Sequence, residues 1–170
     1  SGSDSGTKTV QIAEVRQVRN VPFYVVRIGE LEHFYTEELQ WAGTARDQKV
    51  ESRMTPPHPW FVWPLEAGRR WTHRGTFEER NGSTAVSDSF AVVGTELVEV
   101  PAGRFSALKV VREANRGDSD EYWYVPEVRF YARWVGQRGS TRFEEKLREY
   151  RAAPRLIPGP PPPVPPSKTP

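Results

Sequence analysis

Hydrophobic and polar residues alternate along much of the chain between Lys8 and Tyr150, with a period of two residues. The clearest stretch lies near the C-terminal end of that region. One side of it carries Val128, Phe130, Ala132 and Trp134, and the other carries Arg129, Tyr131 and Arg133. Because successive side chains of a strand point to opposite faces, this pattern predicts a half-buried antiparallel strand.

Similar short runs, separated by turn residues, predict a series of hairpins. The predicted strands cover residues 8–18, 23–28, 32–36, 44–55, 71–79, 86–93, 96–100, 105–112 and 122–134. Asn81-Gly82 and Pro101-Ala102-Gly103 supply turn chemistry between neighbouring runs. Gly94 is expected either to break its strand or to mark a bulge. Residues 141–150 fit a helix or a strand, and the hairpin rhythm favours the strand.

One connection is unusually rich in aromatic rings and prolines. It runs from Pro56 to Leu65 and includes Trp60, Phe61 and Trp63. Proline is excluded from helix interiors and from central strands, so this segment is predicted to be irregular. An apolar loop is best explained as a lid that plugs one end of a sheet.

The pattern divides the chain into three parts. Residues 1–7 read as a solvated leader or an expression remnant, 8–152 as one antiparallel β domain, and 153–170 as a proline-rich tail of polyproline II type. Within the domain, Val15–Thr36 resembles Leu97–Tyr124 in its order of strand, turn, strand and aromatic cluster. This internal similarity suggests that the sheet is built from two similar halves.

Composition narrows the functional classes. There is no cysteine, which excludes disulfides, thiolate catalysis and cysteine-bound zinc. The net charge is only +2, with 24 Lys and Arg interspersed among 22 Asp and Glu, so no nucleic-acid footprint is indicated. The longest apolar run, Trp60–Leu65, is too short to span a bilayer, and no transmembrane segment is predicted.

Catalytic and metal-binding patterns are weak. His33, His58 and His73 stand in unrelated sequence settings, and Asp118–Glu121 is better explained as a hairpin tip than as a calcium loop. A Gly-x-Ser-x-Gly nucleophile turn and a phosphate-binding glycine loop are both missing from the sequence. The sequence therefore predicts no enzyme, with no catalytic residue, no metal site and no cofactor.

Large aromatic residues are the remaining candidates for a site. Seven of them are candidates for the wall of an apolar groove: Trp41, Trp60, Phe61, Trp63, Trp71, Phe130 and Trp134. The simpler explanation is that these rings form the core of the β domain. The alternative is a groove that is closed by the Trp60–Leu65 loop.

Three motifs resemble a domain family of unknown function in exported bacterial proteins and lipoproteins. They are Trp63–Trp71, Val100–Phe105 and Tyr122–Val128, in that order. The resemblance implies a strongly curved antiparallel sheet, similar to the half-barrels of lipoprotein carriers such as LolA, and a periplasmic or envelope-attached location. In such carriers the concave face holds an acyl chain.

Two functions are therefore expected as alternatives. In the first, the domain binds an acyl chain, a lipid or another apolar ligand on the concave face of its sheet. In the second, it is an envelope scaffold whose sheet edge or proline-rich tail, residues 153–170, docks a protein partner.

Overall fold

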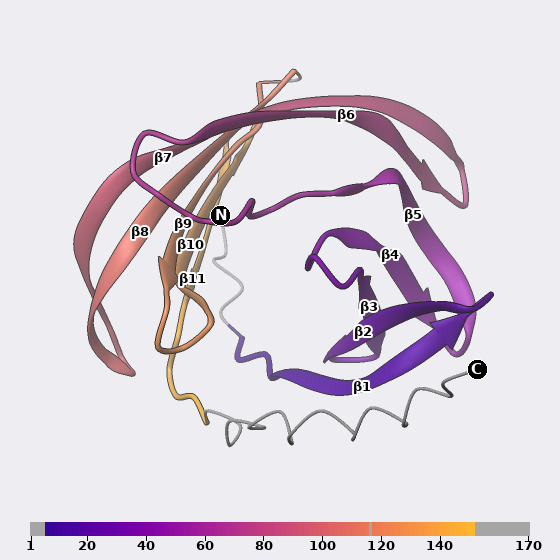
Figure 1. Cartoon of the computed structure of the whole chain (residues 1–170), viewed down its shortest axis with the longest axis horizontal. Coiled ribbons are helices and arrows are strands. Elements are labelled where there is room, and N and C mark those ends of the chain that lie inside the picture. The colour runs from indigo at the N-terminus through magenta and orange to yellow at the C-terminus, as the bar shows by residue number, and fades with distance from the viewer. Residues whose placement is uncertain (1–5, 116, 152–170) are drawn as a thin grey trace, which may run out of the picture.

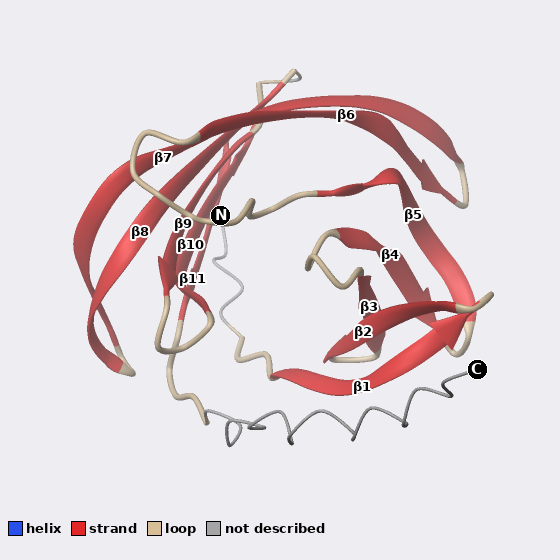
Figure 2. Ribbon diagram, viewed as in Figure 1, coloured by secondary structure: helices blue, strands red, loops and turns tan. Residues whose placement is uncertain are grey.

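The computed structural model describes residues 6–115 and 117–151, which form strands and connecting turns without any helix. The strands are β1 (Val10–Val18), β2 (Val21–Ile28), β3 (Leu31–Tyr35), β4 (Trp41–Arg46), β5 (Lys49–His58), β6 (Arg70–Glu79), β7 (Gly82–Val100), β8 (Gly103–Ala114), β9 (Ser119–Val125), β10 (Phe130–Arg138) and β11 (Thr141–Lys146). The predicted all-β class is confirmed (Figure 2).

Each strand pairs with the next one along the chain, and all pairings are antiparallel. The described residues thus form one sheet of 11 strands in the order β1 to β11. Figure 1 shows that the sheet curls strongly, with β6 to β11 arching around the space that β1 to β5 partly enclose. The sheet begins at β1 and ends at β11 without a ladder between these two strands, which confirms the predicted half-barrel.

Side chains connect the two ends of this open sheet. Lys8, just before β1, pairs with Glu145 of β11, and Arg148 donates a hydrogen bond to Thr7 at 2.9 Å. Because both contacts involve exposed side chains, they hold the two ends together only weakly.

The long strand β7 contributes buried side chains to both faces of the sheet. The register shifts between Val92 and Gly94, so the residue between them is bulged. Before the bulge, Phe90 and Val92 join one buried cluster, and after it Val98 and Val100 join another. Gly94 therefore belongs to a bulge, the second of the two predicted alternatives, because an extra residue reverses which face the following side chains occupy.

A second bulge overturns the predicted alternation at the C-terminal strand. β10 begins at Phe130, after a turn, and its register shifts between Tyr131 and Arg133. Ala132 consequently packs in the same cluster as Val128, whereas Trp134 packs in the other cluster with Tyr131. The prediction that Trp134 shares a face with Val128, Phe130 and Ala132 was wrong, because the bulged residue changes the parity of the strand.

The proline-rich connection begins later than predicted. β5 continues through Pro56 and Pro57 to His58, and its ladder with β6 ends at Thr55 opposite Thr76. The prolines are tolerated because they follow the end of that ladder, where no further donor is required. The irregular lid is therefore residues 59–69, hereafter the lid loop. The preferred strand in 141–150 is confirmed as β11, although it ends at Lys146.

The predicted proline-rich tail, residues 153–170, and most of the predicted leader lie outside the described residues. Residues 6–115 and 117–151 contain no helix of the length and hydropathy required to cross a membrane.

Candidate functional site

The lid loop crosses the inner, concave face of the sheet (Figure 1). Trp60, Phe61 and Leu65 pack there against a cluster that includes Tyr122 and Tyr124 of β9. The ring centroid of Phe61 lies 5.2 Å from that of Tyr124. We call the side of the sheet that the lid loop covers the inner face.

Beneath the lid loop a chain of buried charged side chains crosses five strands. It consists of His58 on β5, Asp88 on β7, Arg112 on β8, Asp120 on β9 and Arg138 on β10. The first four are almost fully buried, with exposures of 2%, 2%, 8% and 0%. We call this set the charge chain.

Each link of the charge chain is a short polar contact. His58 Nε2 lies 2.7 Å from Asp88 Oδ2, and Arg112 Nη1 donates to Asp88 Oδ1 at 2.7 Å. Arg112 Nε donates to Asp120 Oδ2 at 2.6 Å, and Arg138 Nη2 donates to Asp120 Oδ1 at 2.9 Å. Trp134 Nε1 adds a bond to Asp120 at 2.9 Å. Buried charges require such pairing, because an unpaired one would cost several kcal/mol.

Two glycines make room for side chains on the inner face, namely those of Trp134, Asp120 and His73. A Cβ at Gly136 would lie 2.5 Å from the Trp134 ring and 3.0 Å from Asp120 Oδ1. A Cβ at Gly75 would lie 2.8 Å from the Thr55 carbonyl and 2.9 Å from His73 Nε2. Both glycines are thus explained by close approach on the inner face.

The contacts of Asp88 fix the ionisation of this carboxylate. Burial alone would raise the pKa of Asp88, but the hydrogen bond with His58 and the charge of Arg112 outweigh it and hold this pKa below its ordinary value. Burial raises the pKa of Tyr122, beside the chain, well above 10.0. At neutral pH, Asp88 is therefore a carboxylate and Tyr122 a neutral phenol.

A second histidine lies against the first. His73 of β6 is 6% exposed, and its ring centroid is 4.7 Å from that of His58. Burial lowers the pKa of His73, the neighbouring His58 lowers it further, and Asp88 opposes the change. The two histidines stand in unrelated sequence settings, and antiparallel pairing of β5 with β6 and of β6 with β7 brings their rings together.

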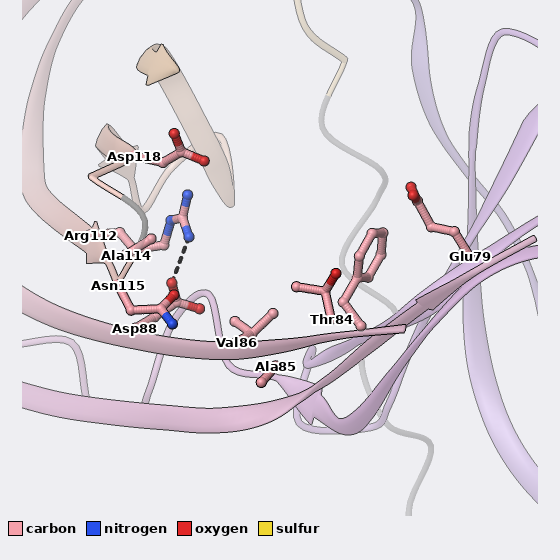
Figure 3. Close-up of a pocket in the computed structure, with 10 residues that line it drawn as sticks. Glu79, Thr84, Ala85, Val86, Asp88, Arg112, Ala114, Asn115 and Asp118 are labelled. Carbon is pink, nitrogen blue, oxygen red and sulfur yellow. Dashed lines mark hydrogen bonds and ion pairs between the residues drawn. The ribbon is translucent and has the colours of Figure 1, made fainter. Parts of the chain in front are cut away.

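A hollow of about 220 Å³ opens on the inner face beside the charge chain (Figure 3). Figure 3 shows Asp88 and Arg112 joined at one end of it and Glu79 at the other, with Thr84 and Val86 between them. Phe77 also lines it, and its ring centroid lies 6.0 Å from that of Trp41. The hollow thus runs from a paired charge to an aromatic wall.

A row of aromatic and apolar side chains leads across the N-terminal strands to the charge chain. Val15 pairs with Tyr24, Tyr24 with Tyr35, Tyr35 with Trp41, and Trp41 with His58. Because directly opposite residues share a face, these side chains all lie on the inner face. Exposure falls from 60% at Val15 and 36% at Tyr24 to 2% at His58. We call Val15, Tyr24, Tyr35 and Trp41 the inner row.

The inner faces of the two ends of the sheet approach each other at Tyr35. Burial raises the pKa of Tyr131 on β10, as do Glu145 and then Tyr35 of β3. The Tyr131 hydroxyl donates to Glu145 at 3.0 Å, and burial raises the pKa of Tyr35 itself to about 12. The inner row therefore lies opposite β10 and β11 across the interior of the curl.

The structure brings together four of the seven predicted aromatic residues. Trp60, Phe61, Trp71 and Trp134 all pack against the inner cluster under the lid loop. Trp71 stacks on Phe90 at 5.0 Å and donates from Nε1 to the Pro59 carbonyl at 2.9 Å.

The other three predicted residues lie outside that group. Trp41 belongs to the inner row. Trp63 is 44% exposed and contacts Tyr124 edge-on. Phe130 stacks on Tyr131 at 4.3 Å.

Sequence analysis missed the charged core of the site. Asp88, Phe90 and Val92 occupy alternate positions, so the same period that marks Phe90 as buried also places Asp88 on the inner face. Asp120 has the same relation to Tyr122. A charged residue in phase with apolar neighbours was therefore the available signal.

The chemistry that this arrangement offers centres on the His58–Asp88 pair. His58 and Asp88 form a pair that resembles the base of a catalytic triad, but neither Ser87 nor Ser89 faces them, since both flank Asp88 on the opposite side of β7. Residues 6–115 and 117–151 hold no group of three or more His, Asp or Glu side chains placed to bind a metal.

Comparisons of the chain with protein-family models, curated proteins and solved structures give no match.

Proposed function

We propose that this domain is a non-catalytic binding module that takes an apolar ligand, such as an acyl chain or a lipid, on the inner face of its sheet. The inner row carries the proposal, because it forms an apolar track that starts at an exposed strand edge and ends at a buried site. The resemblance to half-barrel lipoprotein carriers is its second support. An exported, envelope-attached location is part of the same proposal.

The dimensions of the row suit a long apolar chain. From Val15 to His58 it crosses four strand-to-strand steps, which is roughly 19 Å at about 4.8 Å per step. Each methylene that leaves water on such a surface contributes about 0.8 kcal/mol. Half-buried Tyr35 and Trp41 supply flat rings for this contact at little cost in side-chain entropy.

The hollow alone is too small for a complete ligand. Its volume of about 220 Å³ is below the roughly 300–1,000 Å³ of ordinary small-molecule sites. A long chain would therefore occupy the open inner row and extend toward the hollow at Phe77, which contacts Trp41.

Ligand binding is tested with native mass spectrometry of the purified protein and with tryptophan quenching by a spin-labelled stearic acid. We expect co-purified or added fatty acid to bind and to quench. Trp41→Gln should weaken binding by about tenfold or more, because a polar amide then interrupts the apolar track.

The control variant for this experiment is Val50→Ser. Val50 is apolar and 62% exposed, and it lies at the β4–β5 turn outside the inner row. Binding should be unchanged in this variant. If wild-type protein neither carries nor binds fatty acids or phospholipids, the proposed function is wrong.

A second candidate is docking of a protein partner at a strand edge. β1 pairs only with β2, and its exposed Val15 and Val18 leave an apolar edge on which a partner strand could pair. A pull-down with and without residues 153–170 separates edge docking from docking by the proline-rich tail. Loss of the partner on deletion assigns it to the tail, and retention assigns it to the folded domain.

A further inference from the structure

His58 joins the lid loop to the charge chain. It is the last residue of β5, directly before the loop, and its ring centroid lies 4.4 Å from that of Trp60. Trp60 in turn covers Arg112 at 5.9 Å and contacts Tyr122 at 5.6 Å. Through these contacts the position of the loop on the inner face is linked to the position of the His58 ring.

The carboxylate beside the two histidines already has partners. Asp88 contacts His58 and accepts a hydrogen bond from Arg112. Farther along the charge chain, Asp120 pairs with Arg112 and Arg138, Asp118 lies 3.8 Å from Arg138, and Tyr122 is neutral. A proton on His73 would therefore find only Asp88, already paired, as a nearby counter-charge in a dry region.

Two histidine nitrogens also lack partners. His58 Nδ1 and His73 Nε2 are buried and accept or donate no hydrogen bond within the described residues. A Cβ at Gly75 would lie only 2.9 Å from His73 Nε2, so the backbone of β6 packs closely against this nitrogen. A proton added there would be buried without an acceptor, and movement of the ring or of the segment that covers it would give that proton access to water.

We propose that the packed rings of His58 and His73 form an acid-sensitive latch, which holds the lid loop closed over the inner face at neutral pH and releases it when His73 is protonated. The proposal rests on the proposed function in one respect only, namely that the uncovered surface would extend the ligand site beyond His58, where the inner row ends. Acidification would uncover the rings of Tyr122 and Tyr124, which Trp60 and Phe61 otherwise cover.

The pKa of His73 determines whether the latch opens as the pH falls or as it rises. Burial and His58 lower the pKa of His73 below 6.5, so the closed form takes up a proton less readily than an opened form. The latch is therefore intact above pH 6.5 and is lost as the pH falls through the depressed pKa of His73. The ion pair of Asp88 with Arg112 persists in that range, because the pKa of Asp88 is held low.

The test is hydrogen–deuterium exchange of the full chain between pH 7.5 and pH 4.5, corrected for the intrinsic effect of pH. In wild-type protein we expect residues 59–69 to lose protection by about tenfold or more below pH 6.5, while β7 to β9 stay protected. His73→Gln should shift or abolish this transition. His33→Gln is the matched control, because His33 is a half-buried histidine on β3 and should leave the transition in place.

A transition that survives His73→Gln with the same midpoint, or loop protection that does not change with pH, would overturn the latch. Simultaneous loss of protection in the loop and in β7 to β9 would overturn it as well, since that is global unfolding. If His73→Gln fails to fold, the wild-type His ring signals are titrated by NMR, and the loop transition must then coincide with the titration of His73. None of these readouts requires a ligand, so failure of ligand binding and failure of the latch are distinguished.

Discussion

The same local motif, Val-Val-Arg, has opposite roles in the two regions of the sheet where it occurs. In β2, Val25 is fully buried and Arg27 is exposed, with 54% of its side chain accessible and only a 3.4 Å contact to Glu32. In β8, Val110 is equally buried, but Arg112 is also buried, with 9% of its side chain accessible. Burial of an arginine is thus decided by what the neighbouring strands place beside it.

The same contrast separates the N-terminal region, β1 to β5, from the C-terminal region, β7 to β10. β7 to β10 contribute nearly all members of both buried clusters. Among the side chains of β1 to β5 that the structure describes, the buried ones are Val25, Ala45, Met54 and His58. The C-terminal region is therefore the stable scaffold, and the N-terminal region is a thinner wall with half-exposed rings. A binding surface is expected on the less stable wall, where packing leaves side chains free to contact a ligand.

The largest predicted effect tests this contrast directly. Arg112→Met leaves Asp88 and Asp120 buried without their main cation and should lower the free energy of unfolding by about 3–5 kcal/mol. Arg27→Met, the matching change in β2, should alter it by no more than about 0.5 kcal/mol. Urea denaturation at pH 7 measures both. Equal losses in the two variants would show that the two regions do not differ as described.

An effect of intermediate size on the free energy of unfolding is expected at high pH, where Tyr35 ionises. Its pKa is raised by burial to about 12 from 10.0, so the folded state holds the phenol proton more tightly than the unfolded state. This stabilising contribution is present below pH 10 and is lost as the pH rises through 12, and it amounts to about 3 kcal/mol. Tyr35→Phe should therefore lose less stability than wild type between pH 9 and pH 11.5 in urea titrations. Tyr24→Phe, the neighbouring position of the inner row, is the control and should follow the wild-type curve.

The smallest effect is expected on the outer side of β1. Arg16 Nη1 lies 2.7 Å from Glu32, and the two side chains are 32% and 17% exposed. Arg16→Gln should cost about 0.5 kcal/mol at low ionic strength and less in 1 M salt, because solvent and salt screen such a pair. Arg46→Gln, whose pair with Glu30 is more exposed, should have no measurable effect. A loss above about 2 kcal/mol for Arg16→Gln would mean that the N-terminal wall is more tightly packed than its exposure indicates.

Much of the fold follows from short-range patterns, and the site follows from them only in part. Alternation in β6 and β7 and the turn around Asn81 were enough to predict that hairpin, because its partners are adjacent in sequence. The aromatic lid was also predictable, since Trp60 and Phe61 lie between Pro59 and Pro64. The partnership of His58 with Asp88, 30 residues away, was not, because it depends on the register of three successive strands.

The sequence by itself determined an all-β chain of consecutive hairpins, because strand periodicity and turn chemistry are local properties of the backbone. Only the tertiary structure decided which face each side chain occupies beyond the bulges in β7 and β10, because one extra residue reverses the parity of everything that follows. It also decided that Arg112 is buried and Arg27 is not, since that difference arises from Asp88 and Asp120 on neighbouring strands rather than from the motif itself.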